Sequence, residues 1–446
     1  MAKFFFRRNL IALLNAVALT GGLLWLGTGV AKAVPSFARQ TGQPCASCHT
    51  AFPELTPFGR SFKLNGYTLE GGDSKLPAVS AMVQTAFTHY AKSLDASPGN
   101  GFGTNNNFDP AQQASLFYAG RINDNLGAFV QATYANSFDG SSISLDNTDL
   151  RYSNSSKIGD SDVVYGITIN NVPSVQDVWN TTPVWRYPFI SSQGLAGPSF
   201  GTMLESFGPS AQLGAGAYLY ARDLVYAEVS AYGSTSSTAQ NALGLSPSSS
   251  AISGLAPYWR LAVEPKWGDH SLMLGTFGMM ANIIPDLTAA DRSVTDKYVD
   301  VGVDAQYQWI GDVHAITFRT SYIYESQTLD ATNQLGGSDN LKDNLQSFRT
   351  SLSYIYDHTI SVTGGYFSLT GSRDTTLYSS IGTDNPDSAG FVADLAYLPF
   401  SKGGPSAWPW FNTRIGISYT TYTKLDGVTA NVGDNNTVML YAWTAF

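Results

Sequence analysis

The chain has 446 residues, of which 13% are charged, and it contains 43 Gly, 24 Tyr, 24 Phe and 9 Trp. A composition this rich in glycine and aromatic residues and this poor in charge is atypical of a cytosolic enzyme. Acidic side chains outnumber basic ones by 34 to 25. This excess argues against a nucleic-acid partner, because the phosphate backbone is itself negative.

The first 33 residues have the three parts of a secretory signal peptide. Basic residues come first, an apolar stretch follows over residues 10–26, and the small-residue pattern Ala31-Lys32-Ala33 ends the region. We therefore predict that residues 1–33 are removed and that the mature chain begins near Val34. A single membrane anchor is the alternative interpretation. Four basic residues leave with the signal, so 21 basic residues remain against 34 acidic ones, a net charge of −13.

Residues 34–79 contain both cysteines of the chain, in the pattern Cys45-Ala-Ser-Cys48-His49. C-x-x-C-H is the attachment pattern of a c-type haem. The two thiols bond to the two vinyl groups of one porphyrin, and the adjacent histidine binds the iron. We predict one covalent haem c, with His49 as its first axial ligand. A small disulfide is the alternative. Haem attachment of this type takes place outside the cytoplasm, in agreement with an exported chain.

The cysteine-containing segment is too short to bury a haem by itself. Its frequent Pro and Gly residues allow at most short helical turns, around residues 45–52 and 57–64. We therefore predict that residues 34–79 form a haem-bearing plug inside a barrel built from residues 80–446. Four phenylalanines can cover the porphyrin faces: Phe37, Phe52, Phe58 and Phe62.

Residues 80–446 have the two-faced strands of a membrane barrel. From residue 299 to 309, one face carries valine, alanine, tyrosine and tryptophan, and the other carries aspartate, glycine and glutamine. One face suits lipid and the other suits water. A soluble β-sandwich is the alternative, but its inward faces would have to be apolar. Here the inward faces carry charges: Arg319, Arg349, Arg414, Asp300 and Asp304.

Loop lengths agree with this interpretation, because outer-membrane barrels alternate short periplasmic turns with longer extracellular loops. Short turns are predicted at 123–125, 222–223, 268–269, 311–312 and 357–358, and long connections at 91–112, 171–210, 233–255, 329–344 and 372–388. The segments between them give about sixteen strands, an even number that returns both chain ends to the periplasmic side. The predicted fold is therefore an all-β transmembrane antiparallel barrel with a small N-terminal plug. The final strand, residues 435–446, is apolar on both faces, which this pattern does not explain.

The second axial ligand must come from outside the plug, since no methionine or histidine lies between Thr50 and Ala81. On the first strand, Met82 has inward parity, whereas His89 shares the parity of the lipid-facing residues. We predict Met82 as the second iron ligand, with water or another residue as the alternative. Methionine ligation raises the reduction potential relative to two histidines.

Arg39 and Arg60, together with Lys63, are the cations predicted to neutralise the two haem propionates, because buried carboxylates need partners. Ordinary surface solvation is the alternative for each. The sequence shows no nucleophilic serine–histidine pair, no glycine-rich phosphate loop and no second cluster of metal ligands. Redox chemistry at one haem is therefore the only chemistry predicted. Three histidines at short turns are expected on the periplasmic rim: His270, His314 and His358.

The segment from Ala33 to Tyr67 resembles a known family. It reads Ala-Val-Pro-Ser-Phe-Ala-Arg-Gln-Thr-Gly-Gln-Pro before Cys45, and Phe-Pro-Glu-Leu-Thr-Pro-Phe-Gly-Arg-Ser-Phe-Lys-Leu-Asn-Gly-Tyr over residues 52–67. This pattern, in the order signal, monohaem segment and barrel, is similar to the fused cytochrome c–porin outer-membrane iron oxidases. The resemblance implies that Cys45 and Cys48 carry the haem, that His49 ligates it, and that extracellular Fe(II) reduces it. It also implies that electrons pass on to a soluble periplasmic cytochrome c.

These observations lead to one functional hypothesis and two alternatives. The hypothesis is single-electron transfer across the outer membrane, with extracellular Fe(II) or another one-electron donor and a periplasmic cytochrome as partners. The barrel would contact outer-membrane lipid, and the N-terminal segment and the C-terminus would lie in the periplasm or the lumen. One alternative is a channel in which the haem-bearing plug serves as sensor or stopper. The other is outward electron transfer to an extracellular acceptor.

Overall fold

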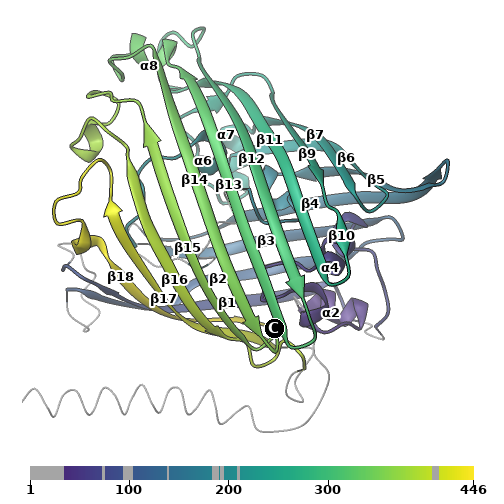
Figure 1. The fold of residues 1–446 in the computed structure, drawn as a ribbon. Helices are drawn as coiled ribbons and strands as arrows, with labels where there is room; N and C mark the ends of the chain where they lie inside the picture. Colours follow the sequence, from purple (N-terminus) through teal and green to yellow (C-terminus); the bar gives the residue numbers. More distant parts are fainter. Residues whose placement is uncertain are drawn as a thin grey trace, which may run out of the picture.

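The computed structural model describes residues 35–72, 76–93, 104–137, 140–182, 190, 195–207, 211–403 and 411–446. The predicted signal peptide, residues 1–33, lies outside these ranges. The described chain is an antiparallel β-barrel with short helices inside it and at its ends (Figure 1). The strands are β1 Val79–Tyr90, β2 Asn106–Arg121, β3 Leu126–Ser137, β4 Gly140–Ile158, β5 Ser161–Asn170, β6 Gln212–Ala221, β7 Val225–Ser234, β8 Ala251–Ile252, β9 Ala256–Val263, β10 Lys266–Trp267, β11 His270–Ile284, β12 Asp296–Ile310, β13 His314–Thr328, β14 Lys342–Tyr356, β15 Ile360–Gly371, β16 Ser388–Tyr397, β17 Asn412–Lys424 and β18 Thr437–Ala445.

All helices in the described part of the chain are short. None of them is long and apolar enough to cross a membrane. They are α2 Pro35–Thr41, α3 Cys45–Cys48, α4 Pro57–Leu64, α5 Pro173–Gln176, α6 Met203–Ser206, α7 Ser237–Ala242 and α8 Asp330–Gln334, with the 3-10 turns η2 Ser379–Ile381 and η3 Val432–Asn435.

The sheet closes on itself, because β1 pairs with β2 on one side and with the last strand, β18, on the other. Strands β8, β9 and β10 lie one after another along β11, and each pairs with a different part of it. These three short strands occupy one place in the wall, so the described chain has sixteen strand positions. The predicted all-β antiparallel barrel of about sixteen strands is confirmed.

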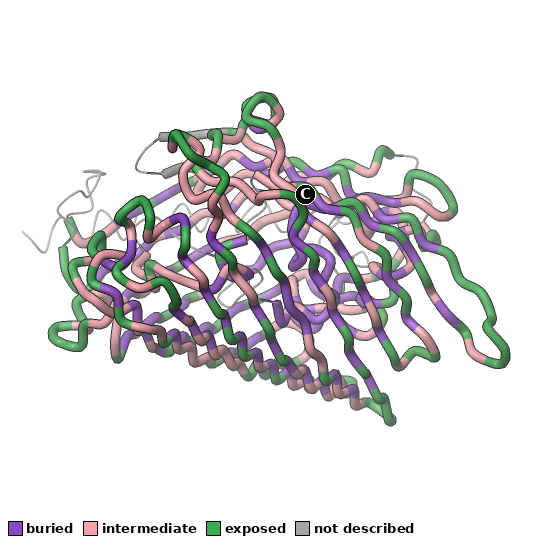
Figure 2. The backbone as a smooth tube through the Cα atoms, turned by 90° about the horizontal axis from the view of Figure 1, so that it is seen from above, coloured by how far each residue is buried: buried purple, intermediate pink, exposed green. Residues whose placement is uncertain are grey.

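The long strands of the wall have a lumen face and an outer face, and Figure 2 shows buried and exposed residues alternating along the strands. In β12, Asp300 and Asp304 are buried, whereas Val301 and Val303 are 45% and 54% exposed. Apolar side chains are exposed in this way over many strands, Leu116 of β2 among them. An apolar surface this extended is unfavourable in water but favourable in contact with lipid chains. The closed wall and the charged inward faces exclude the β-sandwich alternative.

The five short turns predicted from the sequence each join two neighbouring antiparallel strands. At 222–223 and 357–358 all four residues have positive φ, between 50° and 58°, as two-residue hairpin turns of type I′ require. Two connections depart from the predicted alternation. The β3–β4 connection comprises only residues 138–139, and the β16–β17 connection, at the short-turn end, spans residues 398–411.

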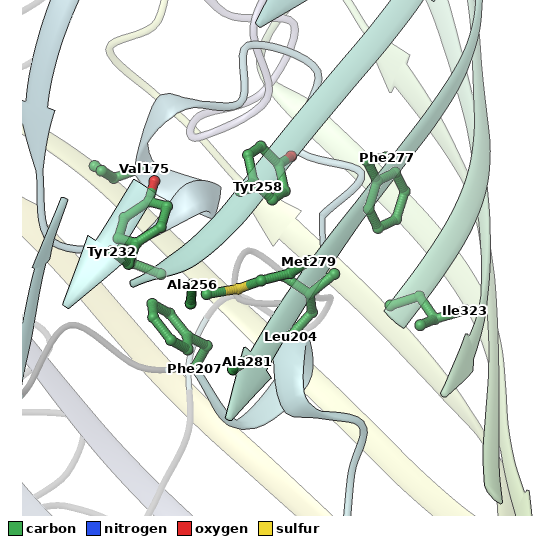
Figure 3. Packing of buried hydrophobic residues seen from close by; sticks show 11 residues of the cluster. Val175, Leu204, Phe207, Tyr232, Ala256, Tyr258, Phe277, Met279, Ala281 and Ile323 are labelled. Atoms are coloured by element: carbon green, nitrogen blue, oxygen red, sulfur yellow. The ribbon is translucent and has the colours of Figure 1, made fainter. Parts of the chain in front are cut away.

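The β5–β6 connection was predicted as a long loop over 171–210, and its described residues around α5 and α6 fold into the lumen. Figure 3 shows Val175 of this connection beside Tyr232 of the wall, and Leu204 beside Met279. The backbone amide of Leu204 donates to a carboxylate oxygen of Asp300 at 2.8 Å. The described lumen therefore holds two inserted segments, this connection and the N-terminal residues 35–72.

The outward face of β12 tests whether the wall faces lipid. Val303→Arg is expected to destabilise the barrel in bilayers by about 2–4 kcal/mol, the cost of an arginine near the bilayer midplane. Leu335→Arg, beside α8 in a loop, is the control, because Leu335 is 53% exposed and Val303 is 54% exposed. Urea unfolding in vesicles, followed by tryptophan fluorescence, measures both variants. Equal stability of the two variants would contradict a lipid-facing wall.

Candidate functional site

Residues 35–72 fold into three short helices because prolines and glycines interrupt them. The α4 helix starts at Pro57, and its N-cap Thr56 accepts a hydrogen bond from the backbone amide of Gly59. A Cβ at Gly59 would lie 2.2 Å from the carbonyl oxygen of Cys48, so glycine permits the close contact between α4 and α3. The turns predicted at 45–52 and 57–64 appear as α3 and α4, and α3 ends early, at Cys48. The sequence pattern does not predict α2.

The two cysteines of the C-x-x-C-H pattern are buried and carry free thiols, so no disulfide joins them. The side-chain amide of Asn412 donates to Cys45 Sγ at 3.0 Å. The backbone amide of Ala46 donates to the carbonyl of Ser401 at 3.0 Å, in the long β16–β17 connection. Burial raises the pKa of the Cys48 thiol to about 12, so the folded chain does not present it as a thiolate. The motif is thus held against the short-turn end of the barrel.

His49 follows α3 directly, and its backbone amide donates to the carbonyl of Cys45 at 2.8 Å. It pairs with Leu55 in an isolated antiparallel bridge, which makes residues 49–55 a tight loop. Burial lowers the pKa of the His49 imidazole to about 4, against a smaller opposing effect of backbone hydrogen bonds at Glu54 and Pro53. The imidazole is therefore neutral near pH 7, which is the form that binds a metal.

The 49–55 loop is fastened to the barrel wall by a buried ion pair. The carboxylate of Glu54 pairs with Arg319 of β13, and the two side chains are 4% and 7% exposed. The same carboxylate accepts a hydrogen bond from the hydroxyl of Ser353 in β14 at 3.0 Å. Its second oxygen accepts one from the hydroxyl of Thr50 at 3.2 Å. The charge of Glu54 therefore links the loop that carries His49 to two wall strands.

Two further wall side chains hold the backbone of the same loop. Arg414 of β17 donates to the carbonyl of Phe52 at 2.7 Å. Gln308 of β12 donates to the carbonyl of Leu55 at 3.1 Å. The loop therefore takes its shape from the barrel and not from a cytochrome core of its own.

A cavity of about 470 Å³ lies beside His49. This volume falls within the ~300–1,000 Å³ typical of small-molecule and cofactor sites. Met82 lines the same cavity and is buried on the inward face of β1, while His89 is exposed on the other face. The structure thus brings together the two predicted axial ligands. Aromatic side chains form much of the wall: Phe37, Phe52, Phe62, Tyr67, Phe117, Phe129 and Trp443.

The cavity also has polar lining that suits the carboxylate edge of a haem. Lys63 is its one cationic side chain among the described lining residues, and Lys63 Nζ donates to the carbonyl of Asp177 at 2.8 Å. Burial, with Arg151 nearby, lowers the pKa of Lys63 to about 8. An apolar space with a thiol, a neutral imidazole, a thioether and a polar side therefore fits a haem c. The other polar lining includes Gln84, Gln113, Gln131, Asp146 and Asn147.

Arg39 and Arg60 do not line this cavity. Arg60 forms a buried ion pair with Glu264 of the wall and donates to Gln308 at 2.6 Å. Arg39 donates to the carbonyl of Val79, where the N-terminal segment enters β1. The contacts therefore give both arginines structural partners and do not support their predicted role at the propionates. Of the three predicted cations, Lys63 is the one at the cavity.

The wall residues that complete the cavity were not predicted from the sequence. For those in β18 there was a signal, the final strand that is apolar on both faces. In β18 the inward residues Met439, Tyr441 and Trp443 pack toward the cavity and the hydrophobic clusters beside it, not toward open water. In β18, apolar residues on the inward face, where other strands have polar ones, thus indicate that this face packs against the cavity. The missed lining residues include Phe117, Phe129, Ile190, Asn412, Trp443 and Ala445.

The other histidines lie where the sequence predicts them. His270 and His314 begin β11 and β13, and His358 lies in the β14–β15 turn, so all three are at the short-turn end. Within the part of the chain that the structure describes, no group of three or more His, Cys, Asp or Glu side chains is arranged to hold a metal ion.

Similar solved structures are outer-membrane β-barrels. OmpT of Vibrio cholerae is 12% identical, with 84% of this chain and 99% of OmpT covered and a TM-score of 0.40. The channel DcaP of Acinetobacter baumannii is 14% identical, with 85% and 100% covered and a TM-score of 0.46. OmpF of Salmonella typhi, in complex with daunomycin, is 12% identical, with 82% and 97% covered and a TM-score of 0.47. No model of a protein family matches the chain, and no curated protein matches its sequence.

The class of the protein follows from its own architecture. Sixteen antiparallel strand positions form a closed wall with an apolar outer face and a polar inner face. These are the features of an outer-membrane β-barrel of the porin type.

The Glu54–Arg319 pair yields a prediction about the loop that carries His49. Removing one partner of a buried ion pair costs about 3–5 kcal/mol. Glu54→Gln is therefore expected to speed amide exchange of residues 49–55 by at least about 100-fold, since each 1.4 kcal/mol is about tenfold. Hydrogen–deuterium exchange in lipid nanodiscs measures this. Lys92→Gln is the control, because the Lys92–Asp434 pair is 70% and 47% exposed and is expected to contribute less than about 1 kcal/mol. Unchanged exchange in Glu54→Gln would contradict the fastening role.

Proposed function

We propose that this outer-membrane barrel is a single-electron carrier with one covalent haem c inside its lumen. Cys45 and Cys48 would bind the haem, and His49 and Met82 would ligate its iron. The observation that carries the proposal is the shared cavity, which places the C-x-x-C-H histidine and an inward methionine beside one aromatic space. A haem bound there supplies one-electron redox chemistry, with a potential raised by methionine ligation.

The chain's own residues would position the cofactor and exclude water from it. The wall holds the 49–55 loop through Glu54, Phe52 and Leu55. Lys63 and the neighbouring amides offer hydrogen bonds to carboxylates. The aromatic lining keeps the local dielectric low, which also raises a haem potential. The proposed reaction needs no proton transfer, because gain or loss of one electron at the iron breaks no bond to hydrogen.

The donor that we propose is extracellular Fe(II), and the acceptor is a soluble periplasmic cytochrome c. Both come from the resemblance of residues 33–67 to the fused cytochrome–porin iron oxidases. A one-electron site suits the conversion of Fe(II) to Fe(III). Oxidation at the outer surface also keeps insoluble ferric products outside the cell. Outward transfer to an extracellular acceptor would use the same parts in the reverse direction.

A diffusion channel is the second candidate function, and the porin-type barrel is the observation that favours it. The two inserted segments oppose it, because a buried ion pair fastens the first to the wall and a partly buried ion pair fastens the second. Arg60 of the N-terminal segment pairs with Glu264, and Arg349 of the wall pairs with Glu205 of the β5–β6 connection. Breaking a buried ion pair is costly, so these segments are expected to stay in place.

Liposomes that enclose oxidised cytochrome c separate the two functions. The electron-carrier proposal predicts reduction of the enclosed cytochrome after Fe(II) is added outside, with no passage of small sugars. Sugar permeation through the intact protein, without reduction of the enclosed cytochrome, would instead support the channel. Liposomes with the Glu54→Gln variant report whether loosening the N-terminal segment opens a path.

Direct reduction by iron is tested by stopped-flow absorbance of the oxidised protein mixed with Fe(II) without oxygen. The proposal predicts rapid appearance of the reduced c-type spectrum, and its loss in a Cys48→Ala control. A haem that dithionite reduces but Fe(II) does not would exclude iron as the donor.

A further inference from the structure

The candidate second ligand, Met82, already has a polar partner in the barrel wall. The indole nitrogen of Trp443 in β18 lies 3.1 Å from the sulfur of Met82 and donates a hydrogen bond to it. A thioether sulfur is a weak acceptor, and a methionine can pack in a protein interior without any hydrogen-bond donor. Trp443 also lines the cavity that Met82 and His49 share. We propose that Trp443 is a positioning residue that holds the sulfur of Met82 and tunes the reduction potential of the haem.

A second contact, with Phe52 of the N-terminal segment, positions the indole of Trp443. Its ring contacts Phe52 edge to face, with 5.2 Å between centroids and an interplanar angle of 81°. Phe52 is in turn held by Arg414, which donates to its carbonyl at 2.7 Å. Arg414 is directly opposite Trp443 in the β17–β18 pairing. The indole therefore connects the loop of the first ligand, His49, to the second, and its N–H has a fixed direction.

The strand register explains why this donor reaches this sulfur. β1 and β18 are neighbours that close the barrel, and Gln84 of β1 is directly opposite Trp443. Met82 and Gln84 point to the same face, and both are buried. Trp443 is thus diagonal to Met82 on the lumen face, a separation that a long aromatic side chain spans.

A hydrogen bond to the ligand sulfur has a defined electronic consequence. The sulfur has two lone pairs, so it can bind iron with one and accept the indole N–H with the other. The hydrogen bond withdraws electron density from the sulfur and weakens its donation to ferric iron more than to ferrous iron. Outer-shell hydrogen bonds of this type tune metal sites. The bond therefore favours the reduced state, and its loss lowers the potential.

This inference rests on the proposed function, and the test separates the two. Trp443→Phe removes the N–H and part of the ring. Replacement of Trp443 by benzothienylalanine, in which sulfur takes the place of the ring N–H, removes only the donor and preserves the shape, so it remains informative if the phenylalanine variant does not fold. Trp267→Phe is the control, since it makes the same substitution at an indole that is 49% exposed and does not line the cavity.

The readouts are spectroelectrochemical titration and the sulfur-to-iron charge-transfer band of the oxidised protein. We expect both Trp443 variants to lower the equilibrium constant for reduction by about fivefold, the worth of one ordinary hydrogen bond. The band should shift in both, while Trp267→Phe leaves it in place. Unchanged potential and band in the benzothienylalanine protein would overturn the inference and leave the electron-carrier proposal intact. A wild-type protein with haem but without that band would overturn the inference together with ligation by Met82, and a protein without haem would overturn the proposed function.

Discussion

Ion pairs with little exposure to water join the barrel wall to the segments inside it. The lumen faces of many strands carry charges, and a charge without water must find a partner. Glu54 from the N-terminal segment and Glu205 from the β5–β6 connection provide such partners for Arg319 and Arg349. The ion pairs therefore fix the positions of these segments in the lumen, and the segments in turn neutralise the charges of the wall.

This dependence explains how a short segment can hold its C-x-x-C-H pattern beside a cavity. Residues 35–72 have three brief helices and too little apolar surface for a core of their own. The barrel supplies the other side of the cavity, with Phe117 of β2, Phe129 of β3 and Trp443 of β18. The cavity exists only where the two parts meet. The cavity is therefore a property of the whole chain, and neither part contains it alone.

The sequence predicted the barrel well because period-2 alternation in a membrane wall is a local pattern. Val301 and Val303 face outward and Asp300 faces inward for reasons that residues 299–309 contain in full. The parity of Met82 followed from the same rule. Partners across the lumen could not be predicted, because they depend on strand positions far apart in the chain. Arg60 shows this, since its partner Glu264 lies 204 residues away. Of the unpredicted residues, those of β18, among them Trp443, were signalled by the strand that is apolar on both faces.

The electron-carrier proposal requires one covalent haem c in the lumen of this barrel. Intact-mass spectrometry tests it most directly, on the mature protein purified from the outer membrane of a host that attaches haem c. The account predicts the mass of the mature polypeptide plus one haem, and the mass of the polypeptide alone when Cys45 and Cys48 are both replaced by alanine. A wild-type mass without haem, with both thiols open to alkylation after unfolding, would contradict it.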